Sequence, residues 1–238
     1  MGILVAGIAH EINNPMTYCV AGAEAARGLA GRLIETSSTT HDVGELRNEV
    51  AVCMGQASEA LSDALDGASR ATQLVRDLLV FARTGSAETS TVDVRSAVEA
   101  SLRIVRQPLR HVARLKLALG DAQAVRGSES SLVQVFVNLL INAVQAITER
   151  PSGNDEITIA MRQAEGEVIV EVSDTGPGIP AGARARIFDA FFTTKAAGIG
   201  TGLGLSICHR IVTSMGGRLE AESRGEGGTT LRVVLPTN

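Results

Sequence analysis

The sequence predicts an α+β protein in which an N-terminal helical hairpin precedes an α/β sandwich. Two observations support this prediction. The first 85 residues carry apolar side chains at steps of three and four and show no strand-like alternation, which is typical of helices. The remaining residues mix helical segments with strictly alternating ones, and the alternating segments form pairs that are typical of antiparallel strands. We therefore divide the chain into residues 1–85 and residues 86–238.

Composition narrows the class of protein. The 238 residues are 45% hydrophobic but only 3% aromatic, so the core must be aliphatic. A net charge of −4 argues against a nucleic-acid partner, because a nucleic-acid binder usually carries a basic face. No run of 18 apolar residues appears, so we expect no membrane segment in this chain. The three cysteines are odd in number and widely spaced, which favours a reduced, cytoplasmic protein.

The N-terminal half is expected to hold two long helices. The first runs from Met1 to about Glu35, and a polar run up to Asp42 separates it from the second, which Thr40 or Asp42 could cap and which ends near Arg83. The apolar residues near one face of the first helix are Val5, Ile8, Ile12, Cys19, Ala23, Ala26 and Leu33. Those of the second are Val50, Met54, Ala57, Leu61, Ala64, Ala68, Leu74, Leu78 and Phe81. Two helices cannot enclose a core, so a homodimer that forms a four-helix bundle is the simplest arrangement.

Residues 83–91 have the composition of a linker. Beyond it, residues 131–149 and 203–215 have helical periodicity, and Gly216 and Gly217 end the second of these helices. The segments that alternate as strands are residues 114–120, 156–163, 167–174, 217–223 and 229–236. Mostly antiparallel strands with helices beside them predict the α/β sandwich.

Polar residues and glycines of the second half form three patterns. Asn138 and Asn142 are four residues apart and share one helix face, although two asparagines alone more often mark a solvated face. Asp174 ends a strand and is followed by a turn that contains Gly176 and Gly178. A glycine-rich run after Lys195 then leads into a helix, where backbone N–H groups can approach a phosphate. Such a loop alone is more often an ordinary turn, but the three patterns in this order indicate a phosphate-binding site.

Six stretches of the chain resemble parts of sensor histidine kinases. "VNLLINAVQAI", "DTGPGI", "IFDAFFTTK" and "GTGLGLSI" resemble the N, G1, F and G2 boxes, and "GIAHEINNP" resembles the H box. "ATQLVRDLLVFAR" resembles the second helix of the dimerisation and phosphotransfer domain. The resemblance covers nearly the whole chain. It implies a helical-hairpin dimerisation domain at 1–85, joined to an ATP-binding domain of the gyrase, Hsp90, histidine kinase and MutL superfamily at 86–238.

The resemblance also implies roles around ATP and Mg²⁺. Asp174 would accept a hydrogen bond from the adenine amino group, in the turn that holds Gly176 and Gly178. Asn142 would bind Mg²⁺ through its amide oxygen, a donor that suits this ion. Asn138 stands where ATPase relatives carry a catalytic glutamate, so that ATP is spared for histidine. The residues expected to contact the phosphates are Lys195, Gly198, Gly200, Thr201, Gly202, Leu203 and Gly204.

The segment from Asp189 to Gly200 is expected to form a mobile lid over the nucleotide. We expect at least one of Phe188, Phe191 and Phe192 to anchor this lid by packing, although all three could be plain core residues.

His10 is the expected phosphate acceptor. Helical geometry turns it away from the apolar seam of Ile8 and Ile12, where a histidine is usually idle. Beside an ATP site, however, its neutral imidazole can attack the γ-phosphate, and positioning and Mg²⁺ carry most of the catalysis. Glu11 would accept the ring proton, or is merely a solvated helix acid.

Asn14 completes a Glu11-x-x-Asn14 pattern that in many relatives supports dephosphorylation of the partner response regulator. Asn14 would then orient a hydrolytic water. Pro15 removes a helix hydrogen bond, so it should bend the helix just after the site.

The expected function is ATP-dependent autophosphorylation on His10, followed by transfer to the receiver domain of a response regulator. Only nine residues precede His10, so we expect either the core of a longer protein or a signal from a separate sensor protein. The alternatives are an ATPase or serine kinase on the same fold, against which the H box and Asn138 argue. A non-catalytic dimeric scaffold is a third alternative, against which Asp174, Asn142 and the glycines argue.

Overall fold

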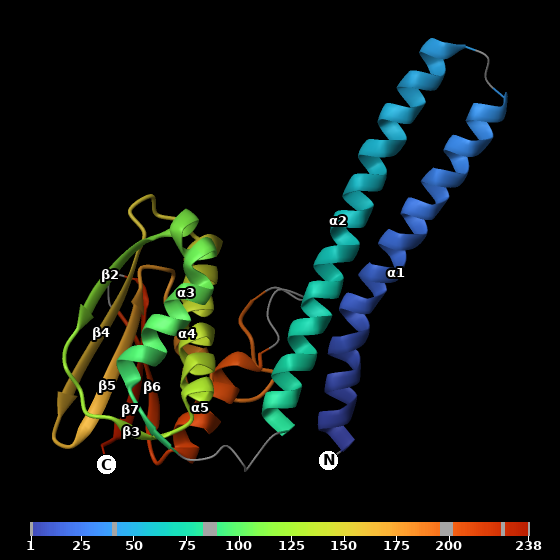
Figure 1. Cartoon of the computed structure of the whole chain (residues 1–238). Helices are drawn as coiled ribbons and strands as arrows, with labels where there is room; N and C mark the ends of the chain where they lie inside the picture. The colour runs from blue at the N-terminus through green and yellow to red at the C-terminus, as the bar shows by residue number, and fades with distance from the viewer. Residues whose placement is uncertain (1, 40–41, 83–89, 196–201, 225–226, 238) are drawn as a thin grey trace. The chain divides into compact units, whose positions relative to one another are not determined.

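A computed structural model describes residues 2–39, 42–82, 90–195, 202–224 and 227–237. The described residues fall into two compact units, a helical one that ends at Ala82 and an α/β one that follows it (Figure 1).

The first unit is an antiparallel helical hairpin, as predicted. It consists of α1 (Gly2–Thr39) and α2 (Val43–Ala82), which pack along one another (Figure 1). The first helix continues through Pro15 and past the predicted end at Glu35. The side chains of its last turn bond back to the helix, since Thr39 Oγ1 donates to the Glu35 carbonyl oxygen at 3.0 Å.

Asp42 begins the second helix of the hairpin. Its Oδ1 accepts hydrogen bonds from the backbone N–H groups of Gly44 at 2.7 Å and Glu45 at 3.3 Å. This confirms one of the two predicted caps. Thr40, the other predicted cap, lies outside the described residues.

Small residues line the contact between α1 and α2. A Cβ on Gly22 would lie 2.3 Å from the Ala60 carbonyl oxygen, and a Cβ on Gly67 would lie 2.7 Å from the Pro15 carbonyl oxygen. Only glycine allows backbones to approach this closely. Ala23, which was predicted on the apolar face, is exposed instead.

Among the described side chains of α2, the exposed large apolar ones are Val43, Val50, Val52, Met54, Leu61, Leu65 and Val75. Four of them, Val50, Met54, Leu61 and Leu65, recur at steps of four, seven and four, which is close to the spacing of a heptad pattern. The hairpin by itself therefore leaves an apolar seam uncovered.

The second unit is a five-stranded sheet with helices on one face, which confirms the predicted α/β sandwich (Figure 1). The strands lie in the order β2, β4, β5, β7, β6, and only β2 and β4 run parallel. Their bounds are β2 (Arg114–Leu119), β4 (Glu156–Ala164), β5 (Glu167–Asp174), β6 (Arg218–Ser223) and β7 (Thr229–Pro236). The helices are α3 (Val94–Val112), α4 (Glu129–Glu149) and α5 (Gly204–Ser214), with a short 3₁₀ turn at Ala181–Ala183.

Three features of this unit differ from the sequence prediction. The helix α3 and the short strand β3 (Val125–Gly127) were not predicted. The predicted linker is wrong at its end, because Ser90 and Thr91 belong to β1 (Ser90–Val92), which pairs with β3. The polar composition of these residues hides their pairing with a distant strand.

The core of this unit is aliphatic, as the composition predicted. Leu132, Phe136, Leu139 and Leu140 of α4 are fully buried against the sheet and α3. Among the described residues, α4 alone is long and apolar enough to cross a membrane by length and composition, a test that the core helix of a folded domain also passes.

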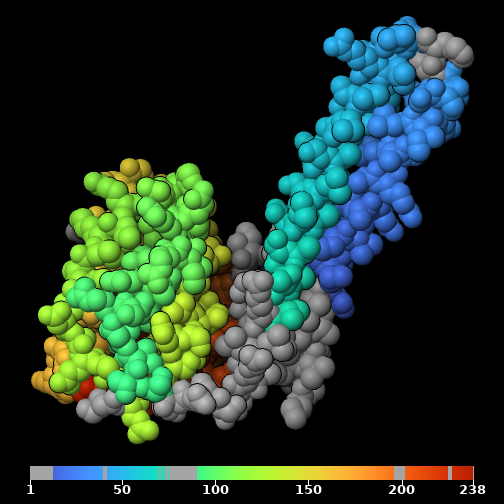
Figure 2. All heavy atoms as spheres, in the orientation of Figure 1, coloured from blue at the N-terminus to red at the C-terminus, as the bar shows by residue number. Residues whose placement is uncertain are grey.

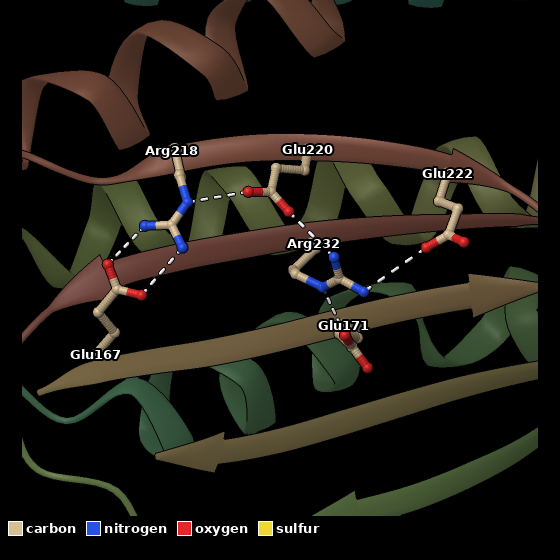
Figure 3. A network of polar contacts seen from close by, with 6 residues as sticks. All are labelled: Glu167, Glu171, Arg218, Glu220, Glu222 and Arg232. Carbon is tan, nitrogen blue, oxygen red and sulfur yellow. Dashed lines mark hydrogen bonds and ion pairs between the residues drawn. The ribbon is translucent and has the colours of Figure 1, made fainter. Parts of the chain in front are cut away.

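The sheet face opposite the helices carries a network of charges (Figure 3). Arg232 lies 2.6 Å from a carboxylate oxygen of Glu171 and 3.1 Å from one of Glu220. Arg218 contacts both oxygens of Glu167, and this guanidinium holds the pKa of Glu167 below its usual range. The network satisfies the charges of three neighbouring strands and keeps this face polar.

Candidate functional site

Asp174 is a buried carboxylate at the end of β5, with 5% of its surface exposed. Its Oδ1 accepts hydrogen bonds from the backbone N–H groups of Gly176 at 2.8 Å and Thr229 at 3.3 Å. Its Oδ2 accepts none from the described residues. Burial raises the pKa of Asp174, while the two N–H groups and the charge of Arg224 oppose this rise. A buried carboxylate oxygen without a donor is costly, so Oδ2 marks a site for a ligand that carries N–H.

Glycines bring the backbone close around this carboxylate. A Cβ on Gly176 would lie 2.9 Å from Asp174 Oδ1, and a Cβ on Gly228 would lie 2.2 Å from the Asp174 carbonyl oxygen. Gly178 and Gly228 also have positive φ values of 80° and 95°, which favour glycine. Gly176 and Gly178 were singled out from the sequence, whereas Gly228 and Thr229 were not. The paired glycines before the last strand were the available signal.

The predicted asparagines share a half-buried face of α4. Asn138 Nδ2 donates to the Gly204 carbonyl oxygen at 3.4 Å, which ties α4 to the beginning of α5. Asn142, one turn further along, makes no hydrogen bond with the described residues, so its amide oxygen is available to a cation.

Lys195 lies beside the same helix. Its Nζ donates to Gln145 Oε1, and its backbone N–H donates to Thr193 Oγ1 at 3.1 Å. Burial lowers the pKa of Lys195, and the charge of Glu149 opposes this effect. No acid among the described residues forms an ion pair with its ammonium group. A partly desolvated cation of this kind favours an anionic ligand.

The beginning of α5 offers backbone N–H groups to such an anion. No side chain caps this helix end, where positive potential gathers. Gly202 has a φ of 63°, and a Cβ there would lie 2.4 Å from the Phe191 carbonyl carbon. Leu203, one of the predicted phosphate contacts, is buried, with 1% of its surface exposed. Only its backbone could therefore contact a phosphate.

Two of the three predicted anchor phenylalanines make ring contacts: Phe188, just before the predicted lid, and Phe192, within its first residues. The Phe188 ring stacks on His209 of α5, with centroids 5.3 Å apart, and packs against the core. The Arg186 guanidinium lies 4.5 Å from the centroid of the Phe192 ring.

Several predicted site residues fall outside the described part of the chain. Gly198, Gly200 and Thr201 are among them, with the adjoining part of the predicted lid. His10 and Glu11 lie within α1, but only their backbone is described. Asn14 is exposed on the same helix. The roles of these residues stay predictions.

Comparison with known proteins agrees with this arrangement. Residues 127–238 match the family of histidine kinase-, DNA gyrase B-, and HSP90-like ATPases. The chain is 33% identical to the C4-dicarboxylate transport sensor protein DctB of Rhizobium meliloti (strain 1021), over 99% of this chain and 34% of DctB. It is 30% identical to the sensor histidine kinase ZraS of Escherichia coli (strain K12), over 100% of this chain and 46% of ZraS.

Solved structures share the fold. The catalytic domain of histidine kinase ThkA is 28% identical with a TM-score of 0.56, over 63% of this chain and 97% of that one. The complex of ThkA with the response regulator TrrA gives a TM-score of 0.65 at 24% identity, over 100% of this chain and 62% of that one.

The chain spans between about a quarter and a half of the length of the curated relatives it matches. Over that span it pairs the helical hairpin with an ATPase-family domain whose presence implies an ATP site. Residues 127–238 therefore form a domain of the histidine kinase-, DNA gyrase B-, and HSP90-like ATPase family, and over its whole length the chain matches sensor histidine kinases.

Proposed function

We propose that this chain uses ATP to phosphorylate His10 and then passes the phosphoryl group to an aspartate in the receiver domain of a response regulator. The observation that carries the proposal is Asp174, a buried carboxylate with one oxygen that accepts no hydrogen bond from the described residues, beside turns that favour glycine. In this proposal residues 1–85 form the dimerisation and phosphotransfer domain, and residues 86–238 form the ATP-binding domain.

Adenine would be recognised by the free oxygen of Asp174. Oδ2 can accept a hydrogen bond from the exocyclic amino group of adenine, while Oδ1 is held by Gly176 and Thr229. Guanine carries a carbonyl oxygen at the equivalent position, which would meet the carboxylate as acceptor against acceptor. The glycines at 176 and 228 support this assignment, because a Cβ at either position would collide with Asp174, at Oδ1 and at the carbonyl oxygen respectively.

The phosphates would lie at the beginning of α5, near Lys195. Gly202 and Gly204 are described there, and Gly198, Gly200 and Thr201 would complete the cradle. Asn142 would hold Mg²⁺, since its half-buried amide oxygen has no partner among the described residues and amide oxygen is a donor suited to this ion. When bound, Mg²⁺ neutralises charge on the phosphate oxygens.

In the transfer step a ring nitrogen of His10 attacks the γ-phosphorus of ATP. The new N–P bond forms as the bond from the γ-phosphorus to the bridging oxygen breaks, and ADP leaves. Glu11 would accept the proton from the other ring nitrogen. Asn138 cannot act as a base toward water, which favours transfer to histidine over hydrolysis.

The hairpin would act as a homodimer. Val50, Met54, Leu61 and Leu65 are exposed, with 41%, 62%, 50% and 68% of their surfaces free. A second copy would cover this seam and complete a four-helix bundle.

The proposed location is the cytoplasm, with input from a separate sensor protein or from further parts of a longer chain. Asn14, exposed on α1, would orient a water that hydrolyses the phosphorylated regulator, so the chain would also be a phosphatase.

Incubation with γ-labelled ATP tests the proposed kinase reaction. Label that stays on the chain in alkali and leaves in acid supports a phosphohistidine, and the His10→Gln variant should not acquire it. Release of phosphate without labelling of the chain would support an ATPase, and no turnover at all would support a scaffold.

A further inference from the structure

A groove lies between the C-terminal half of α3 and the edge strand β2. It encloses about 490 Å³. Leu102, Leu109, Ala113 and Leu115 give it an apolar lining, and the exposed Arg103, Arg106 and Arg110 add three positive charges. In Figure 2 the green atoms of α3 face the viewer, and no other element of this unit lies over them.

The strand beside this groove, β2, is an edge strand of the sheet, and no described strand pairs with its outer side. Arg114 N donates to the Asp155 carbonyl oxygen and Gly120 N to the Met161 carbonyl oxygen, each at 2.9 Å. Alternate residues of a parallel strand bond to its neighbour, so the N–H and C=O groups of Leu115 and Leu117 point away from β4.

The far end of this edge is already occupied. Arg95 Nη2 donates to the Leu119 carbonyl oxygen at 2.8 Å, which agrees with the outward direction of the odd-numbered residues. The free stretch is therefore centred on Leu115 and Leu117.

The side chains of the free stretch lie on the groove side of the sheet. Leu115 and Leu117 are in register with Ile157 and Ile159, which are buried beneath the helices. Leu115 and Leu117 themselves keep 36% and 51% of their surface exposed. An uncovered strand edge with exposed leucines is a surface onto which another strand can add.

The positive charges beside the groove indicate which kind of strand it would bind. Among the described residues no acid forms an ion pair with Arg103, Arg106 or Arg110, although the whole chain carries a net charge of −4. These three arginines recur at steps of three and four, so they lie along one side of α3. They would meet acidic side chains of a strand laid beside β2.

We propose that this groove binds an extended segment of a partner protein as an added strand beside β2, and that this segment carries both apolar and acidic side chains on the face that it turns toward α3. Main-chain hydrogen bonds to Leu115 and Leu117 hold the segment. Its apolar side chains contact the leucines of the groove, and its carboxylates pair with the arginines of α3. The inference concerns a surface outside the nucleotide site, so it stands independently of the proposed kinase activity.

The probe is a labelled octapeptide with blocked ends and the sequence Thr-Val-Thr-Glu-Thr-Val-Thr-Glu, which places valine and glutamate on one face of an extended strand, titrated into the full chain by fluorescence anisotropy. We expect saturable binding that weakens as salt rises, and at least tenfold weaker binding to the Arg103→Glu/Arg106→Glu double variant. Arg162→Glu is the matched control, because Arg162 is exposed on β4 and its neighbour Met161 points to the helix side. It should bind like wild type. The same peptide with lysine in place of glutamate should not bind.

Hydrogen exchange separates strand addition from simple charge attraction. The peptide should slow exchange at the amides of Leu115 and Leu117. Leu117→Pro removes one outward N–H and should abolish binding without breaking the pairing with β4, whereas Leu117→Val should retain it. Binding without this protection overturns the proposal. The proposal is also overturned if the double variant binds the peptide as tightly as wild type, or if no binding is seen up to about 1 mM peptide. Binding of anionic lipid vesicles in place of the peptide would overturn it as well.

Discussion

Replacing Asp174 with asparagine should remove adenine recognition and leave the fold intact. Both backbone donors, Gly176 and Thr229, bond to Oδ1, and the amide oxygen of asparagine can take over both bonds. The amide nitrogen then replaces Oδ2 and presents N–H to the amino group of adenine, donor against donor. Loss of a hydrogen bond to a charged group costs about 1.5–3 kcal/mol. The ATP affinity should therefore fall roughly 10- to 150-fold.

Calorimetry with non-hydrolysable analogues of ATP and GTP measures this effect on the full chain. Discrimination between the two nucleotides should shrink, because the new N–H can donate to the guanine carbonyl. The thermal stability of the ligand-free variant should not fall, since burial disfavours the charged form of Asp174 and raises its pKa.

A second buried acid of the same unit provides the control. Asp155 accepts hydrogen bonds from Ser152 and Gly153 within its own loop, so Asp155→Asn should reduce stability and leave nucleotide affinity unchanged. Equal affinity of wild type and Asp174→Asn for both analogues would refute the reasoning, because Oδ2 would then face no adenine. A large loss of stability in Asp174→Asn would show instead that the charge itself holds the turn.

Four further outcomes are expected. His10→Gln should abolish labelling by γ-labelled ATP while calorimetry shows ATP affinity within a few-fold of wild type. Asn142→Ala should lose turnover at ordinary Mg²⁺ concentration far more than it loses thermal stability; retained turnover would exclude it as a ligand. Asn14→Ala should still phosphorylate the cognate regulator but slow the decay of the phosphorylated regulator in a time course, and unchanged decay would leave Asn14 structural. Hydrogen bonds, first from the Ser152 hydroxyl, lower the pKa of Asp155 from its ordinary 3.8. The stability that the ionised Asp155 carboxylate contributes is thus present above pH 3.8 and is lost as pH falls through the lowered pKa. Denaturant titration should therefore show that the difference in free energy of unfolding between wild type and Asp155→Asn becomes smaller over that acidic range.

The sequence predicted the hairpin and the main strands because the spacing of apolar residues follows the face of each element that is buried. The alternation in β4 and β5 matches their buried Ile157, Ile159, Val168 and Val170. Periodicity did not predict how α1 meets α2. The two helix backbones come close at Gly22 and Gly67, because glycine has no side chain to keep them apart. A hydrophobic pattern does not record this property.

The residues that the sequence missed depend on contacts between distant segments. Thr229 supports Asp174 from a position 55 residues further along the chain, through a backbone N–H that any residue other than proline could offer. Likewise, β1 exists because Ser90 and Thr91 meet Gly127 and Arg126. Local composition carries little information about either contact, whereas Asp174 and Gly176 are close in sequence and could be found together.

Asn138 has a structural contact as well as a proposed chemical role in the nucleotide site. Its amide donates to the Gly204 carbonyl oxygen, at the residue where α5 begins. A glutamate there would set a carboxylate against that carbonyl oxygen, so it could not make this contact while ionised, and it would add a base near the phosphates. Asparagine thus supplies a donor that ties α4 to the helix end and withholds a base that could activate water. In the proposed kinase reaction, one side chain would thus both position the beginning of α5 and keep ATP from hydrolysis until it meets the histidine.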